Sequence, residues 1–254
     1  MADKYNPFSI EGKRILVTGA SSGIGRAVAI ECSKVGAHVI ISGRNPERLA
    51  QTLESMEGEG HEIIGADLST EEGVDALIGA LPKLDGMVLC AGIVELWPFQ
   101  FVSQKRFQKI YQTNLFSPIE IMRQIVKKKL YNKGFSIIAI SSISGISDFV
   151  PSNSIYGSGK AALSSFVKYA ANELASKQIR VNTISPGFIY TPIHKNGSIS
   201  EEDLNKVIEK TPIKRWGQPE EIAYAAIYLL SEAAAYITGT DIKIDGGYSI
   251  PFKS

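Results

Sequence analysis

The chain has 254 residues, enough for one large α/β domain with a sizeable core or for two small domains. Its 27 Lys and Arg residues nearly balance its 26 Asp and Glu residues, so neither nucleic acid nor an anionic membrane is expected as its main partner. The first residues lack the apolar core of a signal peptide, no run reaches the ~18–20 apolar residues of a membrane span, and the two cysteines stand far apart, so we expect a cytoplasmic protein without a disulfide framework or metal site.

Short apolar runs alternate with longer amphipathic ones along the chain. The runs expected to form buried strands are Arg14–Thr18, His38–Ser42, Glu62–Gly65, Gly86–Cys90, Phe135–Ile140, Val181–Ser185 and Asp241–Ile244. Helical patterns lie between them near residues 24–35, 46–57, 70–80, 103–130, 155–177 and 219–231. This alternation predicts a single doubly wound Rossmann-type α/β domain over residues 1–254, with a mostly or fully parallel seven-stranded sheet. Residues from about 187 to 217 form a loop long enough to act as a lid, with a short helix expected from Ser200.

A glycine cluster, TGASSGIG at 18–25, follows the first expected strand and opens the first expected helix. Gly19, Gly23 and Gly25 let the backbone turn sharply and approach a pyrophosphate, while the helix N-terminus offers free N–H groups. Their spacing is G-x3-G-x-G rather than G-x-G-x-x-G. The alternative interpretation is a tight turn that allows close packing of the helix on the strand.

The residues after the second and third expected strands bear on the choice of cofactor. No acidic residue follows Ser42, where NAD would need one for its ribose hydroxyls. Arg44 offers a planar guanidinium fork suited to a 2′-phosphate, which favours NADP(H) and leaves NAD(H) possible. Asp67 is a candidate hydrogen-bond partner of the adenine amino group. The alternative for Arg44 is a solvated arginine at the start of a helix. The alternative for Asp67 is an acidic residue that stabilises a helix N-terminus.

Tyr156 and Lys160 are four residues apart in a helical pattern, so they share one face of a helix. A free tyrosine has a pKa of about 10, and a nearby ammonium favours the phenolate. The pair is therefore a candidate proton donor with a cation that tunes it. Because Tyr-x-x-x-Lys is common by chance, the pair gains weight only from the motifs around it.

Taken together, these motifs resemble the short-chain dehydrogenase/reductase family from about Gly12 to Tyr248. In the order that the family uses, the matching segments are TGASSGIG, ADLS at 66–69, CAG at 90–92, NL at 114–115, ISSISG at 140–145, YGSGK at 156–160, VNTISPG at 181–187 and IDGGY at 244–248. The resemblance implies a nicotinamide-dependent oxidoreductase.

The resemblance also implies roles for four catalytic residues. Tyr156 is the general acid in ketone reduction and the base in alcohol oxidation. Lys160 lowers the pKa of that tyrosine and binds the nicotinamide ribose hydroxyls. Ser142 hydrogen-bonds the substrate oxygen, and Asn114 kinks its helix and holds a water that relays protons from Lys160.

The implied cofactor contacts extend over the whole expected sheet edge. The Ile189 main chain and Thr191 would hold the nicotinamide carboxamide. The full set of candidate cofactor-binding residues is Gly19, Ser21, Ser22, Gly23, Ile24, Gly25, Arg44, Asp67, Leu68, Cys90, Ala91, Gly92, Tyr156, Lys160, Pro186, Gly187, Ile189 and Thr191.

Two departures from the family pattern stand out. The family usually has Asn-Asn-Ala-Gly where this chain has Leu-Cys-Ala-Gly at 89–92, so the strand-bridging role of the missing asparagine amide is in doubt, and Cys90 is expected to pack as a small apolar residue. The separation of Ser142 from Tyr156 is one residue longer than expected, which predicts a bulge in DFVPSN at 148–153. Ser141 and Ser144 remain alternatives for the substrate-facing hydroxyl.

Several side chains have open interpretations near the expected substrate site and on the surface. Trp97, Phe99, Phe149, Ile189 and Ile193 are candidates for an apolar substrate pocket or for packing, and His194 is a candidate substrate contact. Residues 127–129, three lysines, are either a solvated cap on a helix dipole or a landing site for an acidic acyl carrier, a reading that Lys177 supports.

The leading hypothesis is an NADPH-dependent reductase of a ketone, with a 3-oxoacyl thioester on acyl carrier protein as the first substrate class. The substrate is thus a small carbonyl or alcohol that a carrier protein possibly presents. The alternatives are an NAD(P)-dependent dehydrogenase of a sugar, steroid or other secondary alcohol and a non-catalytic NADP-sensing protein. The family resemblance implies a homotetramer, with a dimer as the fallback.

Overall fold

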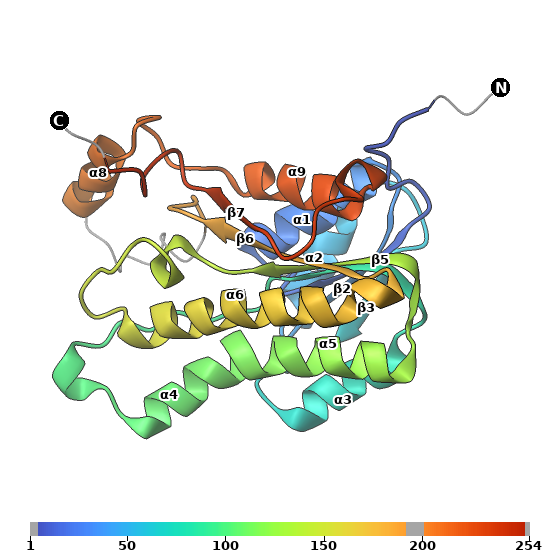
Figure 1. Cartoon of the computed structure of the whole chain (residues 1–254), viewed down its shortest axis with the longest axis horizontal. Coiled ribbons are helices and arrows are strands. Elements are labelled where there is room, and N and C mark those ends of the chain that lie inside the picture. The colour runs from blue at the N-terminus through green and yellow to red at the C-terminus, as the bar shows by residue number, and fades with distance from the viewer. Residues whose placement is uncertain (1–4, 192–200, 252–254) are drawn as a thin grey trace.

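Seven parallel strands form one sheet in the computed structural model, which describes residues 5–191 and 201–251 (Figure 1). The strands are β1 (Arg14–Thr18), β2 (His38–Gly43), β3 (Glu62–Gly65), β4 (Leu84–Leu89), β5 (Tyr131–Ile140), β6 (Arg180–Pro186) and β7 (Asp241–Ile244), in the spatial order 3-2-1-4-5-6-7. Each run that was expected to form a strand pairs in this sheet, and every pairing is parallel. The predicted fold class is therefore confirmed.

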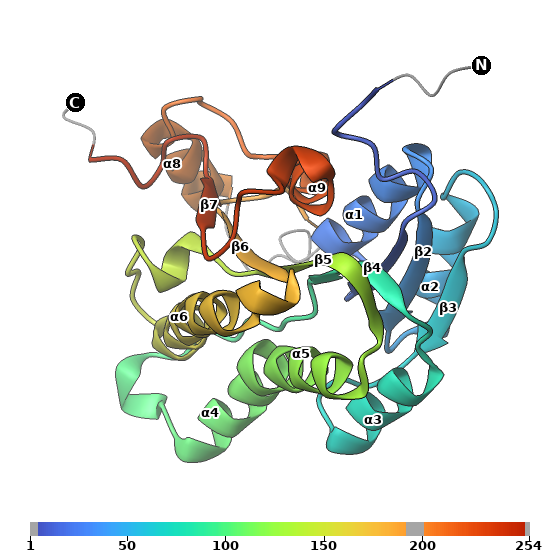
Figure 2. The ribbon, with the colours of Figure 1, turned by 45° about the vertical axis from the view of Figure 1, so that its right-hand side comes forward.

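Helices cover both faces of the sheet (Figure 2). They are α1 (Gly23–Lys34), α2 (Pro46–Glu54), α3 (Glu71–Ala80), α4 (Gln104–Tyr111), α5 (Ser117–Lys128), α6 (Ser154–Leu174), α8 (Glu201–Lys210) and α9 (Pro219–Leu230). One apolar cluster joins α1, α2 and α9 to the sheet, and a second joins α3, α5 and α6 to its other face. Because both faces are covered, the central strands are continuous apolar runs rather than alternating ones.

The helix expected over residues 103–130 is broken in the middle. A π-helical segment, η2 (Gln112–Phe116), separates α4 from α5 and carries Asn114. Pro118 stands in the first turn of α5, directly after η2, and has no N–H to donate to the preceding helical turn. The hydrophobic period alone does not reveal such a bulge, because it is nearly continuous across the whole segment.

The carboxyl ends of the inner strands meet at one edge of the sheet. Thr18 pairs with Ser42 on one side and with Leu89 on the other, so β1, β2 and β4 end level with one another. The β1–β4 segment is the point at which the strand order reverses, and ligands of such sheets bind in the crevice there.

The lysines at 127–129 lie at the other edge. Two of them form the end of α5 and the third is its C-cap, ahead of β5, whose ten residues span about 30 Å before reaching the carboxyl edge. Lys177 likewise precedes the start of β6. Within one chain, neither group borders the crevice, which favours the interpretation of the three lysines as a solvated helix cap.

None of the helices within the described ranges is sufficiently long and apolar to cross a bilayer.

Candidate active site

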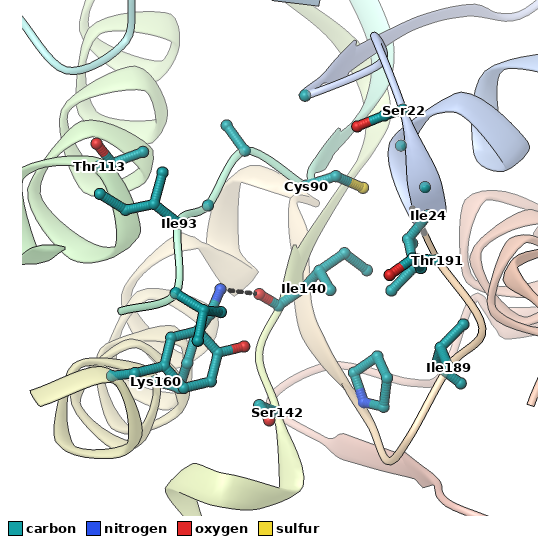
Figure 3. A pocket seen from close by; sticks show the side chains of 18 of the residues that line it. Ser22, Ile24, Cys90, Ile93, Thr113, Ile140, Ser142, Lys160, Ile189 and Thr191 are labelled. Carbon is teal, nitrogen blue, oxygen red and sulfur yellow. Dashed lines mark hydrogen bonds between the residues drawn. The ribbon is translucent and has the colours of Figure 1, made fainter. Parts of the chain in front are cut away.

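A cleft of about 790 Å³ runs along the carboxyl edge of the sheet (Figure 3). Every residue predicted to bind the cofactor lines this cleft, as do Ser142, Tyr156 and Lys160. Asn114 does not line it. The residue positions come from separate strand ends and from α6, so the sheet topology gathers in one place what the sequence separates by up to 172 residues (Gly19 to Thr191).

The glycine turn serves both tight packing of the helix on the strand and close approach of the backbone to a ligand in the cleft. A Cβ atom on Gly19 would approach the Ala91 nitrogen to 2.8 Å, and one on Gly25 would approach the Gly19 oxygen to 2.4 Å, so both glycines are required by packing within the protein. Gly19 and Gly23 both have a left-handed φ, of 67° and 55°, but a Cβ atom on Gly23 would meet only the Thr191 side chain, at 3.4 Å, so Gly23 is required by its backbone conformation.

The N-terminus of α1 suits an anionic group. Ser22 takes the N-cap position without a side-chain hydrogen bond, and the first turn of α1 contains no acidic residue. The free N–H groups of that turn therefore face the cleft with the positive end of the helix dipole behind them. This donor set fits the pyrophosphate of a dinucleotide.

Thr18 supplies the bridge between β1 and β4 that the missing asparagine left in doubt. Its hydroxyl accepts hydrogen bonds from the backbone N–H groups of Cys90 (3.1 Å) and Ala91 (3.2 Å). Thr18 was not among the predicted site residues, although its place at the end of β1 beside β4 is a signal that the sequence contains. The bridge fixes the backbone on which Gly19 packs.

Replacing Thr18 with valine is expected to destabilise the protein by about 1–3 kcal/mol, because valine keeps the shape and leaves the two N–H groups without an acceptor. Thr18→Ser, which keeps the hydroxyl and loses a methyl group, is the matched control. The free energy of unfolding from urea titration measures both. Equal stability of the two variants would show that the bridge contributes nothing.

The end of the cleft beside β2, where the adenosine of a dinucleotide would lie, contains two arginines. We call it the adenosine end. Arg44 follows β2, and Arg48 follows it by one turn in α2. Asp67 accepts hydrogen bonds from the N–H and the hydroxyl of Ser69, which lower the pKa of its carboxyl group, and the charge of Arg44 lowers it further. Asp67 thus remains ionised, with a carboxylate oxygen that can accept from an amino group.

Tyr156 and Lys160 lie one turn apart in α6 at the centre of the cleft. The Lys160 ammonium donates a hydrogen bond to the Ile140 carbonyl oxygen (2.7 Å) and lies 5.8 Å from the centre of the Tyr156 ring. Burial lowers the pKa of Lys160 to about 8. Burial also raises the pKa of the Tyr156 phenol. The Ser142 hydroxyl has a smaller, opposite effect and lowers that pKa. Without ligand, the tyrosine is therefore held in its protonated form.

The buried ammonium has a measurable consequence for stability. The unfolded lysine titrates near pH 10.4, so between pH 8 and 10 the unfolded chain binds more protons and the stability contribution of this group rises with pH. We expect the difference in unfolding free energy between the ligand-free wild type and Lys160→Met to change by about 2 kcal/mol in the wild type's favour over this interval. Urea titrations at pH 8, 9 and 10 measure it. A constant difference would contradict the buried charge.

Three serines follow β5, and the structure separates their roles. The Ser141 hydroxyl donates to the Lys160 carbonyl oxygen (3.0 Å) and accepts from Ser164 (2.7 Å), so it ties the strand to α6. The Ser142 oxygen accepts from the N–H of Ser144 (3.2 Å), and the Ser142 hydroxyl interacts with the Tyr156 phenol. Ser144 also lines the cleft.

Two glycines allow this segment to pack on α6. A Cβ atom on Gly145 would approach the Ala161 nitrogen to 2.6 Å, and one on Gly157 would approach the Ser144 oxygen to 2.6 Å. Beyond them, Ser152 adopts a φ of 66° in a turn. The extra residue between Ser142 and Tyr156 is thus accommodated ahead of the helix.

Asn114 is fully buried behind the cleft. Its side chain accepts from the Ile93 N–H and donates to the Ile93 carbonyl oxygen, both at 2.8 Å. The amide therefore joins η2 to the segment after β4. One N–H and one oxygen lone pair of the amide remain beyond these two bonds.

Cys90 lies in the wall of the cleft as a neutral thiol. Burial raises its pKa to about 12 despite the opposing charge of Lys160. A group with this pKa is a poor nucleophile at neutral pH, in agreement with the expected packing role.

The expected apolar substrate pocket is partly wrong. Phe99 and Phe149 are 84% and 82% exposed and do not line the cleft, and Trp97 instead packs under the Arg106 guanidinium. Apolar side chains that do line it include Ile93, Val94, Leu96, Val150, Phe188 and Ile189. Ile193, His194 and Ser200 lie outside the described residues.

The segment expected to act as a lid is tied at both of its ends. The Tyr190 N–H donates to the Gly217 oxygen (2.8 Å), and the Gly217 N–H donates to the Phe188 oxygen (3.0 Å). Helix α8 lies between these ends, and its first residue, Glu201, follows the predicted start by one position.

A family model described as enoyl-(acyl carrier protein) reductase matches residues 19–249. With this match and the fold and site above, the chain belongs to the short-chain dehydrogenase/reductase family of oxidoreductases.

Particular relatives cover nearly the whole chain. It is 37% identical to the 3-oxoacyl-[acyl-carrier-protein] reductase of Rickettsia conorii, over 94% of this chain and 97% of that protein. The NADP complex of RhlG from Pseudomonas aeruginosa has a TM-score of 0.90 at 32% identity, covering 97% of this chain and 100% of that one. L-sorbose reductase from Gluconobacter frateurii, solved with NADPH and L-sorbose, has a TM-score of 0.87 at 30% identity and the same coverage.

Proposed function

We propose that this protein is an NADPH-dependent reductase that converts a ketone to a secondary alcohol. The observation that carries the proposal is the meeting of Ser142, Tyr156 and Lys160 in one cleft whose far end contains Arg44. Bound NADPH would supply the hydride, and the protein would supply alignment and charge stabilisation. A non-catalytic NADP sensor would not need this set of proton-handling groups.

Each residue has a role that follows from its contacts. The Ser142 hydroxyl, beside the Tyr156 phenol, is placed to hydrogen-bond the substrate oxygen as negative charge develops on it. The protonated Tyr156 donates its proton to that oxygen. Lys160 keeps two N–H groups beyond its bond to Ile140, which suits ribose hydroxyls, and its charge stabilises the phenolate left by proton transfer.

NADP(H) is the preferred cofactor in this proposal. Arg44 and Arg48 both line the adenosine end, where a 2′-phosphate needs cationic partners. The solved relatives that contain NADP and NADPH support the same preference. NAD(H) would leave both guanidinium groups without their anionic partner.

The leading substrate class is a 3-oxoacyl thioester, either free or bound to a carrier protein. The identity of 37% with a 3-oxoacyl-[acyl-carrier-protein] reductase supports it. A hydroxylated ketone such as a sugar is the second candidate. It is favoured by the carboxylate of Asp148 in the wall of the cleft and by the likeness to L-sorbose reductase.

We also propose a homotetramer. Phe116, Phe166 and Tyr169 are partly to largely exposed on η2 and α6, the segments through which the family resemblance expects subunits to meet. Burying such side chains against another copy removes apolar surface from water. Light scattering during gel filtration distinguishes a tetramer from the dimer.

The proposed location is the cytoplasm. Cys32 and Cys90 are both free thiols. Unpaired cysteines suit a reducing compartment.

The test is the loss of nicotinamide absorbance with an acetoacetyl thioester, comparing NADPH with NADH at equal concentration. Turnover at least about tenfold faster with NADPH, worth ~1.4 kcal/mol of transition-state binding, supports the cofactor and the thioester substrate together. Tight NADPH binding without turnover would reject the thioester and direct the search to hydroxylated ketones.

A further inference from the structure

The segment between η3 (Ile143–Gly145) and α6 forms one wall of the substrate end of the cleft. Asp148 lies in this wall. Its backbone N–H donates to the Ile143 oxygen (3.0 Å), as does that of Ser147 (2.8 Å), so the backbone here is fixed by short local hydrogen bonds. The position of the Asp148 carboxylate is therefore set by the turn.

The Asp148 carboxylate is partly buried and has no hydrogen-bond donor among residues 5–191 and 201–251. Burial raises the pKa of this carboxyl group, and the charge of Lys210, at the end of α8, acts against that shift. Tyr248 interacts with it from the segment after β7. A carboxylate that is partly removed from water without a donor is unfavourable unless a ligand supplies one.

The neighbours of Asp148 indicate which donor fits. Val150, Leu96 and Phe188 line the same cleft, as do the polar residues Ser144 and Asn153. An anionic group would meet the negative charge of Asp148 in this poorly solvated place. Lys210 already supplies a positive charge nearby, which lowers the gain from a second cation. A neutral N–H or O–H group has neither disadvantage.

We propose that Asp148 is a specificity-determining residue that accepts a hydrogen bond from a neutral N–H or O–H group of the substrate, away from the reacting carbonyl. This inference rests on the proposed ketone reductase function. Two sources offer that chemistry: the hydroxyl of a hydroxylated ketone and the amide N–H of a thioester arm. They differ in where the donor stands relative to the carbonyl, so matched probes distinguish them.

The experiment compares probes that differ only in the donor. One pair is an acetoacetyl thioester with an N-acetylcysteamine arm against its analogue in which an ester oxygen replaces the amide N–H, and the other is 4-hydroxycyclohexanone against 4-methoxycyclohexanone. For at least one pair we expect kcat/KM to favour the donor-bearing probe by about tenfold or more, the usual effect of a hydrogen bond to a charged group. Asp148→Leu should reduce that ratio to about one, and Asp148→Asn, which keeps an acceptor oxygen, should reduce it only in part.

Ser147→Ala is the matched control, because Ser147 is the preceding residue and does not line the cleft. It should leave the ratio as in the wild type. Wild-type ratios near one for both pairs, or a ratio that survives in Asp148→Leu, would overturn the proposal. The pair that shows the ratio identifies the source of the donor.

A binding measurement separates this inference from the proposed function. In the Tyr156→Phe variant with NADPH present, calorimetry compares the Kd values of the same probes without turnover. If the wild type reduces none of the probes while the donor still improves binding only when Asp148 is present, the reductase function fails and the role of Asp148 stands. If turnover occurs and neither readout depends on Asp148, the reductase function stands and the role of Asp148 fails.

Discussion

Tyr156→Phe is expected to lower kcat for ketone reduction by roughly 10²- to 10⁴-fold, the range typical of losing a positioned proton donor. NADPH binding should be nearly unchanged, because the ring that packs beside Lys160 remains. Single-turnover measurement of nicotinamide absorbance gives the rate, and fluorescence titration gives the Kd of NADPH. The loss should therefore appear in kcat and not in cofactor affinity.

The physical reason is the state of the phenol. Burial keeps Tyr156 protonated in the ligand-free enzyme, which is the correct form for an acid. Donating the proton leaves a phenolate, and Lys160 is the nearby buried cation that can stabilise it. Phenylalanine keeps the shape and removes the only proton that this position can donate.

Tyr111→Phe is the matched control for this variant. Tyr111 belongs to α4, does not line the cleft, and donates its hydroxyl proton to Ser158 in α6 at 3.0 Å. The Tyr111→Phe variant loses one phenol hydroxyl beside the same helix, and its activity should remain close to that of the wild type. Equal losses in the two variants would attribute the effect to α6 packing, and full activity of Tyr156→Phe would refute the proposed mechanism.

The sequence was sufficient to predict the sheet and most of the cofactor side of the cleft. The central strands are buried on both faces, so each is a short apolar run, and the residues that follow each strand lie at the carboxyl edge. Gly19, Arg44, Asp67 and Cys90 all follow strands in this way. Their convergence is a property of the parallel topology.

The substrate side could not be predicted with the same success. Its walls are loops in which a side chain points inward or outward according to turn geometry that no hydrophobic period records. Phe149 faces solvent while its neighbours Asp148 and Val150 face the cleft. The choice among Ser141, Ser142 and Ser144 likewise depended on which hydroxyl α6 engages, a tertiary contact.

Arg44→Ala is expected to lower kcat/KM for NADPH by about 10- to 100-fold and to leave kcat/KM for NADH nearly unchanged, because hydrogen bonds to charged groups contribute about 1.5–3 kcal/mol. The two cofactors differ only at the 2′-phosphate, so a loss confined to NADPH reports on that group. Initial rates at several concentrations of each cofactor, at fixed ionic strength, measure the ratio. Arg26→Ala is the matched control, since Arg26 donates to Ser55 and does not line the cleft.

Arg48→Ala separates the contributions of the two arginines at this end of the cleft. Arg44 directly follows β2 at the sheet edge, whereas Arg48 stands one turn along α2. The preference for NADPH should therefore depend more on Arg44, with Arg48→Ala giving a smaller loss of the same sign. A further change, Arg44→Asp, places a like charge against the phosphate and offers an acceptor to the ribose hydroxyls of NADH, so it should reverse the preference. Equal losses with both cofactors in Arg44→Ala would instead mean that this arginine supports the turn after β2 and does not read the phosphate.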